Sequence, residues 1–570
     1  MTVNNEDFAP VVGTNVNVAD FLAWQVEKRP FQKAVILPAK LQKDGAMAYS
    51  HLTYLQLEAL VDRYAHALSN IGVSREMRVI IGIRPGFDLV AVTFALFKLG
   101  AVPVFIDPGM GKEGFLKCID KANAEAMIGE FKLHVASMIY GKYFTSIKKY
   151  INVGSLSLGK IKSLRKLPYL TEGFPIAETT DTDPAAILFT SGSTGTAKGA
   201  CYTHGTFIHQ IKIIREAYNI TSKDVDMSIF PLFALFAVAM GMTTVIPDMD
   251  ASKPVQADPI KICRTILDQG VTFSFGSPTF WNRISDFCLE HELELPTLRA
   301  LLMAGCSVPA KLHAKFLDHL LKNNGDIYVP YGATEALPLT TFCGSEVLSE
   351  TAGLTDEGKG TCVGKAVSPK NIIKIIEVSD DPISDWKESL EQPVGKIGEI
   401  CARGLTVTCE YFNEPSANEK SKIKQGRYIW HRMGDLGYFD EDGKLWFCGR
   451  KVDRIKTAHG ELYTDQTENV FNCHDAVYRT ALVGIPAQND ESHAVIFVEP
   501  NDRSIIGTPQ GDSVLKDLYE MAKNVPLTEN VSHFIFKDHF PVDVRHNAKI
   551  KREILTEWAK SNTDKITKFS

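Results

Sequence analysis

A loop of small residues that ends in a lysine is the part of this sequence with the clearest chemistry. Residues 187–199 run I-L-F-T-S-G-S-T-G-T-A-K-G, so hydroxyl side chains and glycines lead from an apolar run to Lys198. Glycines let the backbone approach an anion, hydroxyl and N–H groups donate to phosphate oxygens, and the lysine adds positive charge. The pattern predicts a phosphate-binding loop, with a plain polar loop after a strand as the alternative.

The loop differs from the Walker A loop, which requires G-x-x-x-x-G-K-[ST]. Counted from Gly192, the second glycine is replaced by Ala197 and the hydroxyl residue by Gly199. The rest of the chain therefore has to show which nucleotide chemistry the loop serves.

Composition and length limit the classes of protein that this chain can represent. The 570 residues are 45% hydrophobic and 23% charged, which is ordinary for a globular protein of several domains. A net charge of −6 argues against a nucleic-acid-binding surface driven by bulk charge. The eleven cysteines include no C-x-x-C pair, so neither a zinc site nor a disulfide framework is indicated, and a reducing cytoplasm is the expected location.

No signal peptide or transmembrane segment is predicted. The N-terminus lacks a basic start followed by an apolar core. The most apolar stretch, 229–247, contains Pro231 and Gly241 and is too short to span a bilayer. We expect a buried helix that lines a pocket there, and a segment that touches a membrane is the alternative.

The first third of the chain alternates strands and helices. Thr53 and Gln56 form a capping-box pattern before a predicted helix at 55–71. A strand at 79–83, a helix at 87–99 and a strand at 101–106 follow with short connections, which favours a parallel sheet. Residues 131–170 are rich in lysine and weakly patterned, and we predict a surface edge of the subdomain.

The remainder of the chain predicts three further units. Strands at 271–275, 301–303 and 327–330 each end in small or polar turns, which should converge at the carboxyl edge of a second α/β sheet. Short antiparallel strands with Gly/Asp turns suggest a β subdomain at about 371–450. The predicted fold is therefore α/β, with an N-terminal domain at 1–450 made of two parallel-type α/β subdomains and a small β subdomain. A small, mobile α+β domain follows at 451–570.

Six motifs in this order resemble the AMP-forming adenylating enzymes, the superfamily of acyl-CoA synthetases, peptide-synthetase adenylation domains and luciferases. The first is the phosphate loop. The others are Tyr331–Glu335 (Y-G-A-T-E), Gly398-Glu399-Ile400 with Arg403-Gly404, Arg432–Asp435 (R-M-G-D), Gly449-Arg450 with Ile455-Lys456, and Pro541 through Asn547-Ala548-Lys549 with Arg552. The match extends over nearly the whole chain.

The resemblance implies an ATP- and Mg²⁺-dependent ligase that joins a carboxylate to AMP. It implies that the β- and γ-phosphates of ATP are held by Thr190, Ser191, Gly192, Ser193, Thr194, Gly195 and Lys198. Catalysis would rest on Thr334, which donates to the α-phosphate, on Glu335, which holds Mg²⁺, and on Lys549, which stabilises the adenylation transition state.

The same resemblance assigns the nucleoside contacts. Tyr331 would stack on adenine beside Gly332, and Gly305 and Cys306 would frame the other side of the base. Asp435 would accept hydrogen bonds from the ribose hydroxyls, with Arg450 near the same sugar.

The chain departs from the superfamily pattern at positions that are expected to act in the thioester-forming step. Ala234 follows Pro231-Leu232-Phe233, where a histidine or aromatic residue is usual, and Val452 occupies the usual hinge position. His459 replaces a glycine beside the expected pantetheine path, and Ala548 replaces the glycine before Lys549. The adenylation residues are intact, whereas the thioesterification residues are altered.

A narrower resemblance agrees with these departures. Residues 231–236 (P-L-F-A-L-F), 430–437 (W-H-R-M-G-D-L-G) and 541–550 (P-V-D-V-R-H-N-A-K-I) are similar to OleC-type β-lactone synthetases of olefin biosynthesis. This family implies a β-hydroxy fatty acid that is adenylated and then closed to a β-lactone by its own hydroxyl group. Transfer to the thiol of CoA or a carrier protein, and a nucleotide-binding regulator without catalysis, are the alternatives.

The acyl chain needs an apolar site, and the segment 230–242 offers one. Phe233, Phe236 and Met240 have roughly helical spacing there, although each could equally belong to an ordinary core. His204 is a further candidate for contact with the substrate, as a base for the hydroxyl group. A complex with neighbouring pathway enzymes and a homo-oligomer are partner expectations from the resemblance alone.

Overall fold

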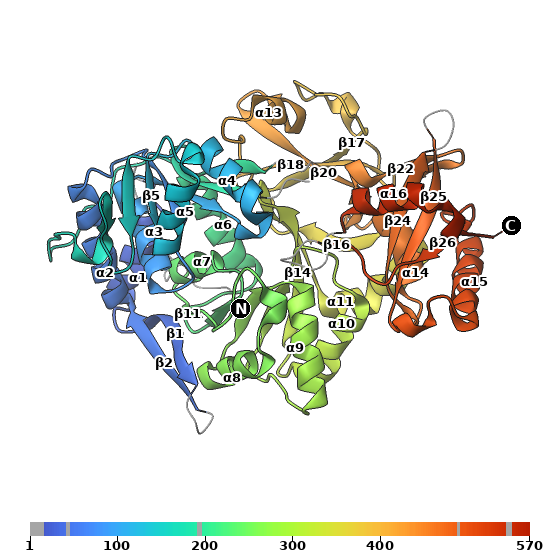
Figure 1. Cartoon of the computed structure of the whole chain (residues 1–570), viewed down its shortest axis with the longest axis horizontal. Coiled ribbons are helices and arrows are strands. Elements are labelled where there is room, and N and C mark those ends of the chain that lie inside the picture. The colour runs from blue at the N-terminus through green and yellow to red at the C-terminus, as the bar shows by residue number, and fades with distance from the viewer. Residues whose placement is uncertain (1–15, 42–45, 191–196, 487–490, 543–549, 570) are drawn as a thin grey trace.

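The computed structural model describes residues 16–41, 46–190, 197–486, 491–542 and 550–569. Two α/β subdomains make up most of the N-terminal part, and the C-terminal domain lies at the opposite end of the molecule from the first of them (Figure 1). In the part of the chain that is described, no helix is both long and apolar enough to cross a membrane.

The first α/β subdomain is built on a seven-stranded sheet with the order β7-β6-β5-β3-β4-β8-β9, in which only the β8–β9 pair is antiparallel. Its strands are β3 (Arg78–Gly82), β4 (Val102–Ile106), β5 (Ala126–Gly129), β6 (Lys149–Asn152), β7 (Ile161–Ser163), β8 (Pro184–Thr190) and β9 (Lys198–Thr203). The helices before β8 are α1 (Ala19–Lys28), α2 (Tyr54–Asn70), α3 (Phe87–Leu99), α4 (Gly111–Ala122) and α5 (Phe131–Ile139).

The second sheet has fourteen strands and a central parallel part. Its order is β17-β18-β20-β21-β16-β15-β14-β13-β12-β10-β11-β1-β2, with β19 beside β20. Its strands include β1 (Lys33–Leu41), β2 (Met47–Thr53), β10 (Val225–Ser228), β11 (Thr243–Val245), β12 (Phe273–Gly276), β13 (Ala300–Met303), β14 (Asp326–Ala333) and β15 (Ala336–Cys343). The helices that belong to this part are α6 (His204–Ala217), α7 (Phe233–Ala239), α8 (Pro259–Gln269), α9 (Pro278–Glu290), α10 (Ala310–Ala314), α11 (Gly344–Glu346) and α12 (Ala352–Leu354).

The predicted β subdomain is a continuation of this second sheet. Thr340 of β15 pairs with Ala366 of β16, and the antiparallel strands follow without a break. They are β16 (Thr361–Ala366), β17 (Ile372–Ile376), β18 (Gly398–Arg403), β19 (Lys422–Gln425), β20 (Tyr428–Phe439) and β21 (Leu445–Arg450), with helix α13 (Pro415–Ser421). The antiparallel part therefore begins before residue 371.

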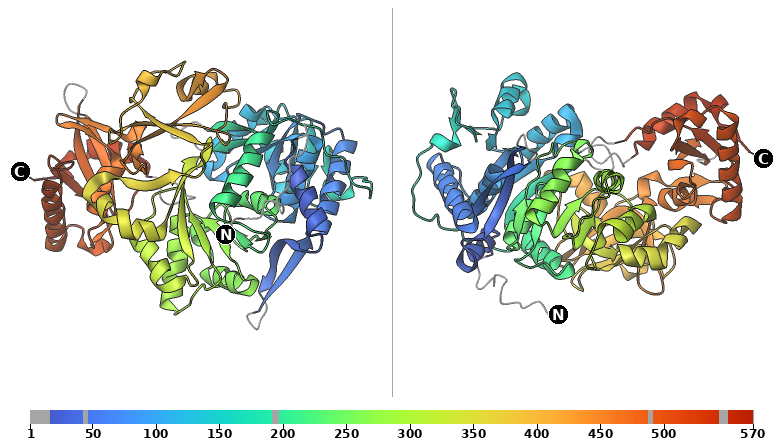
Figure 2. Two further views of the ribbon diagram at one scale, coloured as in Figure 1. Left: turned by 180° about the vertical axis from the view of Figure 1, so that it is seen from behind. Right: turned by 90° about the horizontal axis from the view of Figure 1, so that it is seen from below.

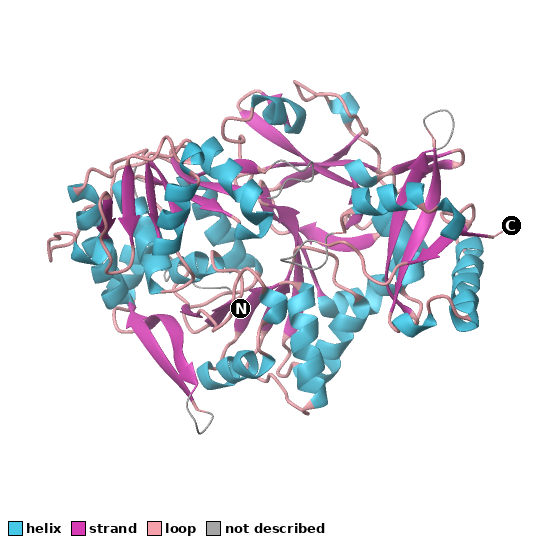
Figure 3. Ribbon diagram, viewed as in Figure 1, coloured by secondary structure: helices cyan, strands magenta, loops and turns pink. Residues whose placement is uncertain are grey.

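The described part of the C-terminal domain combines a four-stranded sheet with a hairpin and three α-helices. Figure 3 shows these strands and helices together at one end of the molecule. The sheet contains β24 (Val477–Pro486), β25 (Ser492–Pro500), β26 (His533–Phe536) and β27 (Thr567–Lys568). The hairpin is β22 (Ile455–Thr457) with β23 (Gly460–Leu462), and the helices are α14 (Thr464–Asn472), α15 (Pro509–Asn524) and α16 (Arg552–Ser561).

Two local predictions show how the sequence sets element ends. The capping box at the start of α2 is confirmed, because the Thr53 hydroxyl accepts from the Gln56 N–H and the Gln56 side chain accepts from the Thr53 N–H. The helix expected within 229–247 is only the seven residues of α7. Pro231 and Gly241 limit it, the latter with a φ of 83°, and β11 follows.

A buried carboxyl group lies in the core of the second sheet. Asp226 on β10 is fully buried, and its Oδ2 accepts from Ser228 and, at 2.8 Å, from Thr244. Its Oδ1 has no hydrogen-bond partner among the described residues. Burial raises the pKa of Asp226 to about 7, against the two hydroxyl donors, which lower it.

We expect Asp226→Asn to change how stability depends on pH. Because the folded pKa lies above the ordinary 3.8, the contribution of Asp226 is full below pH 3.8 and is lost as pH rises through about 7. The variant should be more stable than the parent at pH 8 by up to about 4 kcal/mol, with a difference that shrinks toward pH 4. Chemical denaturation across this range measures it, and parallel curves would contradict the assignment. Asp512→Asn, at an exposed position, is the control.

Candidate active site

A tyrosine, an aspartate and an arginine from three strands of the second sheet form one hydrogen-bonded cluster. The hydroxyl of Tyr331 on β14 donates to Asp435 Oδ2 at 2.7 Å, and the Arg450 guanidinium donates to Asp435 Oδ1 at 2.7 Å. Asp435 and Arg450 are register partners on β20 and β21. Burial and the neighbouring Asp435 carboxylate raise the pKa of Tyr331 well above its ordinary value, so its hydroxyl stays a donor.

Thr334 and Glu335 lie in the tight turn between β14 and β15. The Tyr411 hydroxyl donates to Glu335 Oε1 at 2.6 Å, and the Thr408 N–H donates to the Glu335 carbonyl at 2.8 Å. Gly332 is required before this turn, since a Cβ there would lie 2.5 Å from the Ala336 carbonyl oxygen. The turn therefore holds the Glu335 carboxylate in a fixed position.

The ends of the phosphate loop belong to a β-hairpin. Thr190 at the end of β8 pairs with Lys198 at the start of β9, and Gly199 packs where a Cβ would meet Ile187 at 2.8 Å. Ser191 through Thr196 lie outside the described residues. The loop thus leads into a strand and not directly into a helix, which separates it further from the Walker A arrangement.

Tyr411 links this hairpin to Glu335, and the sequence did not single it out. Its ring has Lys198 Nζ at 5.3 Å and Lys422 Nζ at 5.5 Å from the ring centre, while its hydroxyl holds Glu335. Lys422 is buried on β19 and donates to the Thr408 carbonyl. Burial lowers the pKa of Lys422 to about 8, although the nearby Glu335 charge acts in the opposite direction.

We expect Lys422→Met to stabilise the nucleotide-free protein at neutral pH. Below pH 8 the buried Lys422 is charged in the folded parent protein, and this charge lowers the free energy of unfolding. Between pH 8 and 10.5 the stability of the parent rises, because the unfolded chain binds more protons than the folded protein there. The gain at pH 7 should reach about 3 kcal/mol and fade by pH 10.5, measured by denaturation without divalent cations. Lys420→Met, on an exposed side chain, is the control; a loss of stability at pH 7 would refute the expectation.

Gly305 and Cys306 follow β13, where adenine framing was predicted. Gly305 has a φ of 102°, which glycine adopts without strain. The next residue, Ser307, donates from its hydroxyl to Asp465 Oδ2 at 3.0 Å, and Thr361 donates to Asp465 Oδ1 at 2.7 Å. Since Asp465 belongs to α14, this loop is in direct contact with the C-terminal domain.

Two of the predicted acyl-site residues lie together. Phe233 stacks on Phe273 with ring centres 5.7 Å apart and on Phe236 at 6.0 Å, and it meets Phe275 edge to face. Phe236 also approaches Phe207 at 5.8 Å. Met240 is buried in the same large core at the end of α7, beyond these ring contacts. These rings pack α6, α7 and β12 together in the core, and an acyl site at Phe233 and Phe236 stays a prediction.

His204 has its Nδ1 already engaged. The Val18 N–H donates to this nitrogen at 3.2 Å, so the neutral ring carries its proton on Nε2, which has no acceptor among the described residues. Burial lowers the pKa of His204 to about 4. This arrangement gives His204 a packing role at the first residue of α6 and does not support the expectation that it removes a proton from the substrate.

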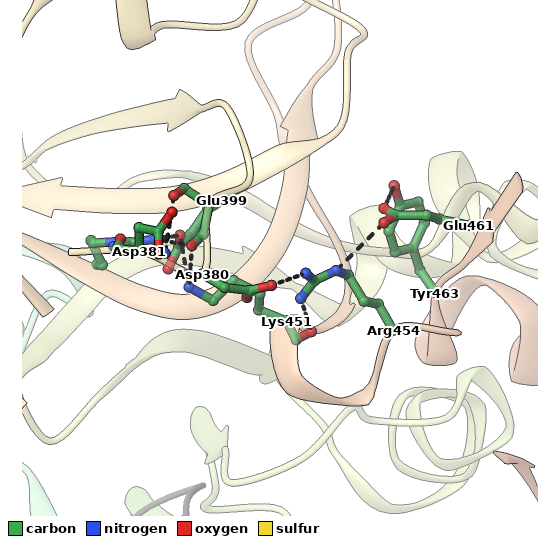
Figure 4. Close-up of polar contacts among 9 residues, drawn as sticks. Asp380, Asp381, Glu399, Lys451, Arg454, Glu461 and Tyr463 are labelled. Atoms are coloured by element: carbon green, nitrogen blue, oxygen red, sulfur yellow. Dashed lines mark hydrogen bonds and ion pairs between the residues drawn. The ribbon is translucent and has the colours of Figure 1, made fainter. Parts of the chain in front are cut away.

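Ion pairs hold the segment that connects the N-terminal and C-terminal domains, on both sides of Val452. Glu399, from the G-E-I motif, is buried and pairs with Arg432 at 2.5 Å and with Lys451 at 3.1 Å. On the other side of Val452, Arg454 pairs with Asp380 at 2.6 Å and with Glu461 at 3.5 Å (Figure 4). The side chain of Val452, at the predicted hinge position, is 56% exposed.

The remaining sequence predictions fall on the C-terminal domain. Lys549 lies outside the described residues, but Val542 and Ile550 pair in an antiparallel bridge on either side of its segment. Arg552 binds Glu468 through two hydrogen bonds. His459 is exposed at the tip of the β22–β23 hairpin.

Comparison with known proteins identifies the family. The model of the AMP-binding enzyme family matches residues 22–412. The chain belongs to this family. It is 40% identical to the olefin β-lactone synthetase of Stenotrophomonas maltophilia over 96% of this chain and 99% of that protein. It is 38% identical to the olefin β-lactone synthetase of Xanthomonas campestris over 96% and 98%.

Solved structures of AMP-binding enzymes share the fold. The amide bond synthetase McbA from Marinactinospora thermotolerans superposes with a TM-score of 0.76 at 20% identity, over 95% of this chain and 99% of that one. The O-succinylbenzoate coenzyme A synthetase from Bacillus subtilis, in complex with AMP, gives 0.72 at 21% identity over 94% and 97%. The protein is thus an AMP-forming ligase of the adenylating superfamily, as the motifs predicted.

Proposed function

We propose that the protein adenylates a β-hydroxy fatty acid with ATP and then closes it to a β-lactone with release of AMP. The observation that carries this proposal is the full-length similarity, at 40% identity, to an olefin β-lactone synthetase. The Tyr331–Asp435–Arg450 cluster supports the first half of the reaction, because three of the predicted nucleotide contacts share one set of hydrogen bonds.

In the first step a carboxylate oxygen of the acid attacks the α-phosphorus of ATP and pyrophosphate leaves. Thr190 and Lys198 would hold the pyrophosphate side, and Thr334 and Lys549 would donate to the charge that develops on the α-phosphate. Asp435 would hold the ribose hydroxyls, with Arg450 orienting its carboxylate through the hydrogen bond to Oδ1.

The residues present fit Mg²⁺ bound together with the phosphates. Among the described residues no group of three His, Cys, Asp or Glu side chains could hold a metal alone, and Glu335 offers a single carboxylate. One or two carboxylates plus substrate phosphates are the usual ligands of this ion. Bound there, Mg²⁺ would neutralise charge on the phosphate oxygens.

In the second step the β-hydroxyl oxygen attacks the acyl carbonyl carbon. The new C–O bond closes the four-membered ring, the bond to AMP breaks, and the hydroxyl proton is released. Because nucleophile and electrophile belong to one bound molecule, orientation supplies the effective concentration and no thiol acceptor is required. Phe233 and Phe236 would bind the alkyl chain, with about 0.8 kcal/mol gained per buried CH₂ group.

The test is product analysis with ATP, Mg²⁺ and a 3-hydroxy fatty acid, with and without CoA. We expect AMP, pyrophosphate and a β-lactone in the absence of CoA. The matching unsubstituted fatty acid should give the acyl-adenylate without lactone. Thioester that forms only with CoA would replace the proposal with a CoA ligase, and no AMP with any acid tested would favour a regulatory nucleotide-binding protein.

A further inference from the structure

Residues 131–170 differ in charge from the rest of the chain. These forty residues contain seven lysines and one arginine and no aspartate or glutamate. The other 530 residues contain 54 basic and 68 acidic side chains. A segment this basic within an acidic protein has no part in the adenylation site described above, so its charge needs a separate explanation.

Most of this charge is exposed and without a carboxylate partner. Arg165 pairs with Asp88 at 3.1 Å. Lys149 is half-buried and donates to the Ile71 carbonyl. The remaining lysines are exposed and form no ion pair with any carboxylate in the described part of the chain: Lys132, Lys142, Lys148, Lys160, Lys162 and Lys166.

Large apolar side chains are exposed among these lysines. Met138 and Ile139 at the end of α5 are 56% and 65% exposed, and Leu156 and Leu158 between β6 and β7 are 50% and 54% exposed. The segment holds seven of the twenty large hydrophobic residues that are prominently exposed in the described chain. Single exposed apolar residues are normal, but such a concentration marks an interaction surface.

The helix and the two strands that carry these residues are neighbours at one rim of the molecule. β6 pairs with β7, the last strand of the seven-stranded sheet, and His134 of α5 contacts the Ile151 carbonyl of β6 at 3.1 Å. Lys160 Nζ lies 3.8 Å from the centre of the Tyr150 ring, which brings the β6–β7 connection back over β6. Figures 1 and 2 show this part of the chain at the end of the molecule away from the C-terminal domain.

We propose that this rim, formed by α5 and the β6–β7 connection, binds the surface of a bilayer that contains anionic lipids. Lysines attract anionic headgroups, and exposed methionine, isoleucine and leucine side chains insert at the boundary of headgroups and acyl chains. Both contributions are present on this rim, and the strength of peripheral binding grows with the buried apolar area and with the attraction to anionic lipids.

A lipid surface fits this composition better than a protein or a nucleic acid. Lysine is depleted in protein–protein interfaces, whereas here it is the dominant charged residue. Nucleic-acid backbones are recognised by basic and polar groups, and four exposed aliphatic side chains would add nothing to phosphate contacts. The long apolar side chains and the flexible lysine heads together match the headgroup region of a membrane.

Vesicle co-sedimentation of the full-length protein tests the proposal. We expect binding to vesicles of phosphatidylcholine with phosphatidylglycerol, at least tenfold weaker binding to phosphatidylcholine alone, and loss of binding at high salt. The triple variant Lys142→Glu, Lys160→Glu, Lys162→Glu should bind the anionic vesicles at least tenfold more weakly. Equal binding of parent and triple variant, or equal binding to both vesicle types, would overturn the proposal.

A second variant separates lipid insertion from simple attraction of polyanions. Met138→Ser, Ile139→Ser, Leu156→Ser and Leu158→Ser together should weaken vesicle binding several-fold and leave binding to soluble heparin unchanged. If this variant binds vesicles like the parent, the rim recognises charge alone and a nucleic acid or acidic protein replaces the lipid. Exposed lysines elsewhere provide the matched control, and Lys387→Glu, Lys396→Glu, Lys516→Glu should bind vesicles like the parent.

Discussion

Replacing Lys549 with alanine is expected to abolish formation of the acyl-adenylate at useful rates while ATP still binds. The lysine ends the N-A-K motif, and the resemblance to the adenylating superfamily implies that it donates to the charge of the transition state. Removal of one such donor costs about 100- to 1,000-fold in rate. Pyrophosphate exchange measures the first step, and calorimetric titration with a non-hydrolysable ATP analogue measures binding.

Lys551→Ala is the matched control for this experiment, because Lys551 is exposed two residues further along the chain. It should exchange pyrophosphate like the parent protein. If Lys549→Ala exchanged pyrophosphate at the rate of the parent protein, the C-terminal motif would be misassigned. Equal loss in both variants would point instead to damage of the segment between Val542 and Ile550, the two residues that pair on either side of it.

Glu335→Gln should lower the rate of adenylation by about 100-fold or more and weaken its dependence on Mg²⁺. The amide keeps the size of the side chain and still accepts from Tyr411, so the turn should remain folded. What it loses is the negative charge that a hard cation requires. Initial rates of pyrophosphate release across a Mg²⁺ series, together with the melting temperature, separate loss of metal binding from loss of fold.

Two companion substitutions sharpen this result. Tyr411→Phe removes only the donor that fixes Glu335, and one lost hydrogen bond of about 1.4 kcal/mol corresponds to a tenfold effect. Glu357→Gln, at an exposed carboxylate outside the cluster, should behave like the parent. An unchanged Mg²⁺ dependence in Glu335→Gln would show that this carboxylate is not the metal ligand.

Local signals in the sequence were sufficient for several elements. The capping box fixed the start of α2, and α3 ends where predicted, at Leu99, because Gly100 adopts a left-handed φ of 66°. The parallel strands β3 and β4 were found because both are short apolar runs on either side of that helix. Such signals are contained in a few adjacent residues, so no knowledge of the tertiary structure is needed to see them.

Contacts between segments that are distant in the chain could not be predicted from the sequence. The sequence around Tyr411 does not indicate its hydrogen bond to Glu335, which lies 76 residues away. The sequence around Lys422 likewise does not indicate that this lysine is buried. The union of the antiparallel strands with the second sheet depends on a single pairing of β15 with β16. The engaged Nδ1 of His204 likewise depends on Val18, which lies 186 residues away.

The hydrogen bonds of Asp465 with Ser307 and Thr361 have a thermodynamic consequence. They join the loop expected to frame adenine to the first turn of α14 in the C-terminal domain, which is the predicted mobile lid. The position of this lid and the shape of the base-binding loop therefore belong to one equilibrium. Linkage is reciprocal: if nucleotide favours the docked lid, the docked lid tightens the hold on nucleotide by the same factor. AMP would therefore leave most readily when these two bonds open, and lid opening would set the pace of product release.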